Sequence, residues 1–388
     1  MANTSGPHDL LIIIDVIESM DAFIQVLNNT LADIISMAAL TGCFQRIGFM
    51  VYHDCIQGFR AKWSGWCSPS GAVQSPEHVS PEAILQQARD IIITRESRCW
   101  PEIKQSALAR AYQEMREDAT TVILFYAEDA EAAAPERNIY VPELSDTTES
   151  TSHGRPNHRL VSGDWTIKAQ VLAKGPKKSV IFTILPVING RDCPWAPYLY
   201  LSRVTGGALF VTITTMEIIS DLTVVLLLTW MGVSNLAERG TYGISMPCLV
   251  EGNVISDPEA EYNTNFQTHC SNLKNVNDVI VYLSDLPAIL ETRGPSVSTI
   301  ALAQKYLDDD DYKKLVVDQI GRLMSKPSGL SSIAINPIFV TLWRCLCNDV
   351  GNPNRLTLFF RLCGELDRTN DPQARERFKS LMDNLLGR

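Results

Sequence analysis

Short apolar runs alternate with amphipathic stretches through the first part of the chain, and this alternation limits the fold more than any other feature. Each run is apolar at nearly every residue, as expected of a strand that is covered on both faces. Between the runs, apolar residues recur at helical spacing. The alternation predicts an α/β fold with a mostly parallel sheet and helices on both faces. The predicted strands are residues 9–15, 46–54, 120–129, 178–185 and 207–212.

The first of these strands ends in an acid. In the stretch "LIIIDVIESMDAF", Asp15 follows four apolar residues and precedes a helix that we expect from about residue 20 to Gly42. In parallel sheets, ligands bind beyond the carboxyl ends of the strands, where the strand order reverses. The loop after Asp15 is therefore the first candidate for a functional site.

The pattern changes after residue 235. Residues 236–275 look irregular, and the segments that follow have helical spacing. A chain of 388 residues is long enough for two domains. We predict a sheet domain over 8–235, with an exposed insertion at about 130–160, and a mainly helical domain over 236–388. The predicted C-terminal helices are 276–293, 298–307, 310–325, 331–349, 354–364 and 372–387.

Composition excludes some classes of partner. The formal net charge is −10, and no basic stripe is present, which argues against a nucleic-acid partner. The most apolar stretch, residues 218–233, contains Asp221 and is shorter than a membrane span, so we interpret it as a buried helix. The N-terminus does not read as a secretory signal, and the ten cysteines lack the spacing of a disulfide framework. These features predict a cytoplasmic, intracellular protein with reduced thiols.

Several local strings, in order, resemble a von Willebrand factor A (VWA) domain of the intracellular, fungal-type subgroup. "DLLIIIDVIESM" is similar to the first strand and its D-x-S-x-S loop, and "RIGFMVYHD" is similar to the second strand. "WPEIKQSALARAYQEM" resembles the T-P-E segment and its helix, and "VILFYAED" resembles the strand before the last metal-associated Asp. "YLSRVTGGALF" and "ISDLTVVLLLTWMG" are similar to the final strand and helix. The resemblance covers about residues 8–233 and implies a VWA-like, Rossmann-like sheet.

The resemblance also implies a metal-ion-dependent adhesion site, in which side-chain oxygens hold Mg²⁺. Asp15 and Ser19 match ligand positions of that site. The other positions depart from the pattern: Ile17 replaces the first serine, Trp100 the threonine, and Glu128 (or Asp129) the last aspartate. Ile17 and Trp100 offer no oxygen to an ion that requires near-octahedral oxygen coordination. The sequence thus indicates a degenerate site, in which Asp15 closes the strand and Ser19 caps the helix.

These residues lead to a functional prediction. We expect a non-enzymatic protein–protein interaction module or scaffold without a cofactor, whose contact face includes Ile17, Trp100 and Glu128. Two alternatives stay open. The first is a Mg²⁺-dependent ligand-binding module that uses Asp15, Ser19 and Glu128. The second is the non-catalytic part of a larger enzyme or signalling protein.

Other clusters of reactive side chains favour ordinary structural roles. Cys345 and Cys347 are two residues apart on a predicted helix, so they do not face one another and are expected to be core thiols. His153 and His158 lie in the polar insertion, where nothing nearby completes a metal site. His53 has a neighbouring Cys55 but no third group to orient a nucleophile.

Overall fold

The structure is a computed structural model of the whole chain. It describes residues 6–16, 20–55, 58–71, 78–91, 101–127, 165–186, 196–212, 215–233, 243–249, 276–290, 294–326 and 329–368, with residues 372, 375, 376, 379, 381 and 383. The predicted insertion at about 130–160 and most of the predicted helix at 372–387 lie outside these residues.

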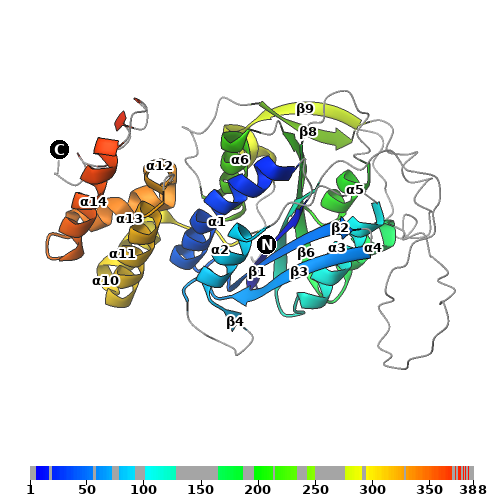
Figure 1. Cartoon of the computed structure of the whole chain (residues 1–388), viewed down its shortest axis with the longest axis horizontal. Coiled ribbons are helices and arrows are strands. Elements are labelled where there is room, and N and C mark those ends of the chain that lie inside the picture. The colour runs from blue at the N-terminus through cyan, green and yellow to red at the C-terminus, as the bar shows by residue number, and fades with distance from the viewer. Residues whose placement is uncertain are drawn as a thin grey trace.

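A nine-stranded sheet organises the first part of the chain, in the order β4-β3-β2-β1-β5-β6-β7-β8-β9 (Figure 1). Strand β1 is central and pairs in parallel with both β2 and β5. The parallel pairing continues to β6 and β7, whereas β3, β8 and β9 join in antiparallel orientation. The strands are β1 (His8–Asp15), β2 (Arg46–Cys55), β3 (Gly58–Cys67), β4 (His78–Val79), β5 (Thr120–Tyr126), β6 (Lys178–Pro186), β7 (Leu209–Thr212), β8 (Gly243–Leu249) and β9 (Val276–Tyr282).

Helices cover both faces of this sheet. Side chains alternate between the faces of a strand, so β1 sends Leu10, Ile12 and Ile14 to one hydrophobic cluster and Leu11 and Ile13 to the other. The first cluster lies under α1 (Asp21–Thr41), α2 (Pro81–Arg89) and α6 (Met216–Trp230). The second lies under α3 (Pro101–Glu114), α4 (Trp165–Lys174) and α5 (Ala196–Val204). Continuous apolar strands are therefore explained by burial on both sides.

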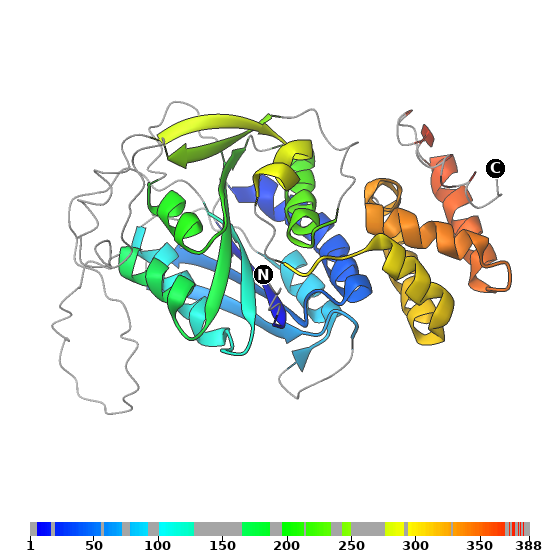
Figure 2. The same ribbon diagram turned by 180° about the vertical axis from the view of Figure 1, so that it is seen from behind.

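The C-terminal part is mainly helical and packs against α1 (Figures 1 and 2). Its elements are the 3₁₀ turn η2 (Leu283–Asp285), α9 (Leu286–Ile289), α10 (Thr299–Asp308), α11 (Asp310–Met324), α12 (Gly329–Ile335), α13 (Pro337–Asn348) and α14 (Asn354–Arg368). The prediction of an α/β fold with a mostly parallel sheet, helices on both faces and a mainly helical C-terminal part is confirmed.

The sheet continues past residue 235, which sequence analysis did not predict. Strand β8 lies in the stretch expected to be irregular, and β9 replaces the first part of the helix expected over 276–293. The two strands pair from Gly243–Tyr282 to Leu249–Val276. The sequence of β9, "VNDVIVY", is rich in β-branched residues, and an apolar run this short fits a strand as well as a helix by periodicity.

The helix expected over 331–349 is broken into α12 and α13, which meet at an angle of 91°. Asn336 lies at the break, and its side-chain oxygen accepts a hydrogen bond from the Ile338 amide at 3.0 Å. Pro337 follows as the first helical residue, a position where its missing N–H costs nothing. An N-cap and a proline together start a new helix here.

Buried polar contacts join α1 to the helical part. The Tyr312 hydroxyl donates to the Leu40 carbonyl at 2.7 Å, and the Ser36 hydroxyl donates to Gln319 at 3.0 Å. Ser332 donates to the carboxylate of Asp33. One hydrophobic cluster also runs from the sheet through α1 into α11 and α13. These contacts fix how the helical part lies against the sheet; the division into domains at residue 235 stays a prediction.

Helix α1 is apolar enough to resemble a membrane span. Among the described residues, Phe23–Thr41 is the segment that is long and apolar enough to cross a membrane as a single straight helix. Within the fold, 83% of its most apolar stretch is buried. It packs against α6 and α11, as a core helix of a globular protein does. The stretch 218–233, interpreted from sequence as a buried helix, contains α6, in which Leu222, Val225 and Leu226 are completely buried.

Candidate functional site

The carboxyl edge of the sheet contains the first predicted site residue. Asp15 is the last residue of β1, is 4% exposed and lies opposite Tyr52 of β2. The next residue, Val16, donates its backbone N–H to the Tyr52 carbonyl at 2.9 Å. On the other side of β1, Ile14 lies opposite Tyr126 of β5. Asp15 is thus held between the carboxyl ends of two parallel strands.

Strand order reverses at this point. From β1 the chain moves outward to β2 and β3, and it later returns to β5 on the opposite side of β1. Asp15, at the end of β1, therefore lies at a switch point, the position where ligands bind in open α/β sheets. The sequence prediction placed Asp15 at such an edge, and its place in β1 agrees with that prediction.

The other predicted site residues, Ile17, Ser19, Trp100 and Glu128, lie outside the described residues, as does Asp129. Described residues flank them. Tyr126 ends β5, and the Ala127 amide donates to the Ile184 carbonyl of β6 at 3.3 Å, which carries the chain to the carboxyl edge before Glu128. Helix α3 ends close to the amino edge, so the helix begins, at residue 101, on the side of the carboxyl edge.

The start of α1 differs from the sequence interpretation. Met20, not Ser19, occupies the N-cap position, and among the described residues no side chain caps this end of the helix. Asp21 lies in the first turn, where its carboxylate favours the helix dipole and accepts a hydrogen bond from Gln25 at 2.9 Å. The other end agrees with the prediction: Gly42 has a left-handed φ of 62°, and its N–H donates to the Ala38 carbonyl.

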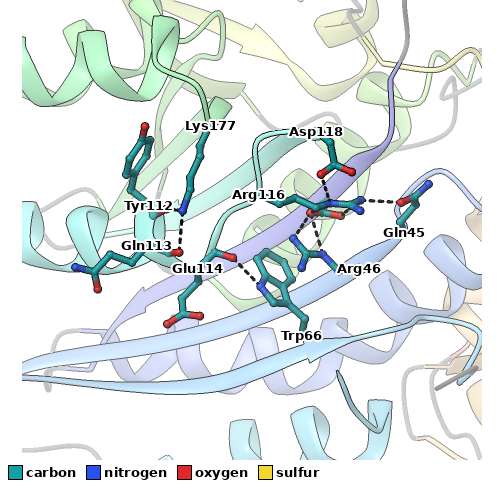
Figure 3. Close-up of polar contacts among 10 residues, drawn as sticks. Gln45, Arg46, Trp66, Tyr112, Gln113, Glu114, Arg116, Asp118 and Lys177 are labelled. Carbon is teal, nitrogen blue, oxygen red and sulfur yellow. Dashed lines mark hydrogen bonds and ion pairs between the residues drawn. The ribbon is translucent and has the colours of Figure 1, made fainter. Parts of the chain in front are cut away.

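A second polar cluster lies at the opposite, amino edge of the sheet, and sequence analysis missed it (Figure 3). Asp9 is completely buried, and both of its oxygens accept hydrogen bonds from arginines. Arg46 donates from Nη2 at 2.6 Å, and Arg116 donates from Nε and Nη2 at 2.9 Å each. An acid inside an otherwise apolar strand was the available signal, because a buried carboxylate requires such partners.

Aromatic and helix-end contacts extend this amino-edge cluster (Figure 3). The Arg46 guanidinium lies 4.2 Å from the ring centre of Trp66, whose Nε1 donates to the Glu114 carbonyl at 2.9 Å. Lys177 donates to two carbonyls of the last turn of α3, at 3.2 and 3.0 Å. The cluster ties β1, β2 and β3 to the end of α3, which indicates a role in stability.

The thiols of the described residues are suited to packing. Cys347 is 2% exposed, and burial raises its pKa to about 12. Burial also raises the pKa of Cys345, and it raises that of Cys43 to about 12. Thiols with raised pKa values are poor nucleophiles and poor metal ligands at neutral pH. His153 and His158 lie outside the described residues, as do the side chains of residues 53–55.

Within the part of the chain that the structure describes, no three His, Cys, Asp or Glu side chains come together as metal ligands. At the carboxyl edge the described residues supply one of the predicted ligands, Asp15. The remaining predicted positions lie outside the described residues, in the parts of the sequence that follow β1 and β5 and precede α3.

No known protein-family profile matches the sequence. Among curated proteins, the chain is similar to an ariadne-like RING finger protein of Acanthamoeba polyphaga mimivirus, with 22% identity over 364 residues. The match covers 90% of this chain but 32% of that protein's length.

Two solved structures show limited likeness. Proximal thread matrix protein 1 from the mussel byssus has a TM-score of 0.34 at 12% identity, over 58% of this chain and 47% of that one. The human COPII-coat protein Sec24c has a TM-score of 0.29 at 13% identity, over 99% of this chain and 57% of that one. These scores are too low to support an inference, so the fold rests on the sheet topology of this chain.

Proposed function

We propose that this chain is a non-enzymatic protein-binding module with a VWA-like sheet, and that its contact face is the carboxyl edge. The observation that carries the proposal is the position of Asp15 at the switch point of the sheet. The proposed contact residues are Ile17, Trp100 and Glu128, which along the chain follow β1, precede α3 and follow β5, respectively. An aromatic and a branched apolar side chain beside carboxylates are typical of the centre of a protein interface.

Residue types support binding without a metal. Mg²⁺ requires about six oxygen ligands in near-ideal geometry. Ile17 and Trp100 stand at two of the positions where the VWA pattern has oxygen donors. Asp15 alone would leave most of the coordination shell to water. A Mg²⁺-dependent module that uses Asp15, Ser19 and Glu128 is the competing reading, and a metal titration separates the two.

The helical part also exposes large apolar side chains, which is consistent with a scaffold that has more than one contact surface. Ile300 and Leu307, seven residues apart on α10, are 81% and 61% exposed. Exposed apolar groups that gather on one part of a protein often mark contact sites. We propose an intracellular location, since Cys43, Cys67 and Cys347 are buried free thiols in the structure.

A pull-down from native cells with wild-type, Trp100→Ala and Phe360→Ala proteins tests the proposed face. We expect Trp100→Ala to lose bound partners that Phe360→Ala retains, with thermal melting used to confirm that both variants fold. Phe360 is a suitable control because it is an exposed aromatic residue on the helical part. Equal recovery of the same partners by wild type and Trp100→Ala would exclude this contact face.

The relation to the RING finger protein favours a second possibility, in which this chain is the non-catalytic region of a longer signalling protein or enzyme. The match spans 32% of that relative. In zinc sites of the RING type, two to four residues stand between the paired cysteines, and no two cysteines of this sequence have that spacing, since Cys345 and Cys347 are separated by a single residue. Sequencing the full transcript tests this: a continuous reading frame encoding a zinc-binding module would support it, and in-frame stop codons on both sides would contradict it.

A further inference from the structure

The two outermost strands of the sheet differ in how well they are protected from further pairing. Strand β4 consists of two residues, His78–Val79, whereas β9 runs for seven residues, Val276–Tyr282 (Figure 1). An outermost strand has backbone N–H and C=O groups that can pair with another chain, and proteins often keep such strands short for that reason. The β4 side of the sheet follows this rule, and the β9 side does not.

Strand β9 also lacks the sequence features that usually prevent pairing. Its sequence, "VNDVIVY", contains neither proline nor lysine, and Asp278 is its only charged residue. Its pairing with β8 proceeds residue by residue from Gly243–Tyr282 to Leu249–Val276, without a bulge. Prolines, lysines and bulges are the devices that keep outermost strands from pairing further. Within the described sheet, the outer side of β9 is therefore suited to accept another strand.

Several large apolar side chains of β9 are exposed. Val281 is 3% exposed and belongs to the hydrophobic cluster under α6. Ile280 and Tyr282 lie on the opposite face of the strand and are 60% and 48% exposed, because side chains alternate along a strand. Val279, on the same face as Val281, is 44% exposed. Apolar side chains exposed along both faces of an outermost strand indicate a contact surface.

The sequence of β9 is complementary to itself in antiparallel orientation. If two copies pair about Ile280, each Ile280 lies opposite its own copy and Val279 lies opposite Val281. Asp278 then lies opposite Tyr282, and the two Asp278 positions are about 13 Å apart along the strands. That separation exceeds the screening length of about 8 Å in physiological salt, so the two carboxylates repel one another weakly.

Other ways of pairing two β9 strands are less favourable. Antiparallel pairing about Asp278 would place the two carboxylates directly opposite one another, which is destabilising. Pairing about Val279 would place each carboxylate against Ile280 and remove it from water without a partner. Pairing about Val281 would join three strand residues of each copy, against five about Ile280. The position of the one charge thus favours a second copy of β9, paired about Ile280.

We propose that two copies of this chain associate through β9, in antiparallel orientation about Ile280, and form one continuous sheet across a twofold axis. The same surface is used by both copies, so the contact closes as a dimer and does not extend into a fibre. Strand β9 lies five strand positions from β1, about 24 Å at the usual strand spacing, so the dimer contact does not involve the carboxyl end of β1. The proposal therefore does not depend on the proposed contact face.

Sedimentation velocity of the full chain over a wide range of concentration tests for the dimer. We expect a monomer–dimer equilibrium in the wild type. Ile280→Lys places a positive charge opposite its own copy and should weaken the dimer about tenfold or more. Leu307→Lys is the matched control, because Leu307 is 61% exposed and lies on α10; it should change the dimer affinity about twofold or less. A wild type that stays monomeric at every concentration, or equal weakening by both variants, would overturn the proposal.

Cysteine cross-linking tests the pairing without adding a charge to β9. In Ile280→Cys the two thiols face one another across the axis, and we expect mild oxidation to form a disulfide-linked dimer. Tyr282→Cys is the control on the same face, because its two copies would lie about 13 Å apart along the strands, beyond the reach of a disulfide. Wild-type protein gives the background from the native cysteines. Equal cross-linking at positions 280 and 282, or none at position 280, would overturn the pairing.

Oxidation of Ile280→Cys in a native cell extract tests the choice of occupant. We expect mass spectrometry to identify a second copy of this chain as the protein linked at position 280. A different protein linked there, in place of the second copy, would overturn the proposal.

Discussion

Arg116 holds Asp9 by two parallel hydrogen bonds, from Nε to Oδ2 and from Nη2 to Oδ1, each 2.9 Å long. This pair joins the turn after α3 to the first residues of the central strand. Arg46 approaches the same carboxylate from the start of β2. Asp9 is completely buried, whereas the side chains of Arg46 and Arg116 are 15% and 26% exposed. The Asp9 carboxylate therefore depends on these hydrogen bonds more than either arginine does, because water does not reach it.

Replacement of Asp9 should destabilise the protein strongly. Asp9→Asn leaves two guanidinium groups facing an uncharged amide, and we expect the free energy of unfolding to fall by about 3 kcal/mol. Urea denaturation followed by circular dichroism measures this change. Asp118 is the control, because it lies 3.5 Å from Arg116 but is 72% exposed. Asp118→Asn should cost about 0.5 kcal/mol or less. Similar losses for both variants would show that the buried cluster does not carry this stability.

The stability of the protein should fall in mild acid, partly because of His8. Burial lowers the pKa of His8 from its ordinary value of 6.5, and the nearby Asp9 acts in the opposite direction to a smaller extent. The unfolded chain then binds the proton more readily than the folded chain. The contribution of His8 is present above its unfolded pKa and is lost as the pH falls through the lower, folded pKa.

A substitution isolates this contribution. His8→Phe keeps the ring contact with Trp230 and removes the titrating group. We expect the free energy of unfolding of this variant to fall less steeply than that of the wild type as the pH decreases below 6.5. Chemical denaturation at a series of pH values provides the measurement. An identical slope in the two proteins would show that His8 does not contribute.

The break between α12 and α13 should depend on Asn336. This residue is 1% exposed, caps α13 through its side-chain oxygen and donates to the Met37 sulfur at 2.9 Å. Asn336→Ala should lower the free energy of unfolding by about 2 kcal/mol, the upper end of the range for N-caps. Ser80→Ala removes the exposed cap of α2 and should cost about 1 kcal/mol. A loss of stability in Asn336→Ala no larger than that in Ser80→Ala would show that the buried cap does not stabilise the break.

The carboxyl edge should not bind Mg²⁺ with measurable affinity. We expect isothermal titration calorimetry with Mg²⁺ and Mn²⁺ to show no saturable heat, and millimolar metal to leave the melting temperature unchanged. The reason is the shortage of oxygen donors at Ile17 and Trp100. A saturable heat that disappears in Asp15→Asn would instead establish the metal-dependent alternative.

The order of strands and helices was readable from the sequence where the apolar pattern was long or repeated. The strands at β1, β5 and β6 are apolar on both faces, and α1 has clear helical spacing up to Gly42. Strand β9 was mistaken for helix because seven residues show too little periodicity to decide, and its pairing with β8 settles the conformation. The conformation of residues 276–282 is therefore set by pairing with β8 and not by local sequence preference.

The two edges of the sheet differ in how far sequence could predict them. Asp15 was found because it ends an apolar run. The partners of Asp9 are 37 and 107 residues away along the chain, so no local pattern connects them. Contacts between distant segments require the folded arrangement.

Site-specific photo-crosslinking identifies the part of the protein that touches its partners. A photoreactive benzoylphenylalanine is placed at position 17 in one protein and at position 360 in another, and each is irradiated in native cells. From position 17 we expect cross-links to the same partner proteins that wild-type protein recovers in pull-downs, and from position 360 we expect none of these. Cross-links to those partners from position 360, with none from position 17, would contradict the assignment of the carboxyl edge as the contact face.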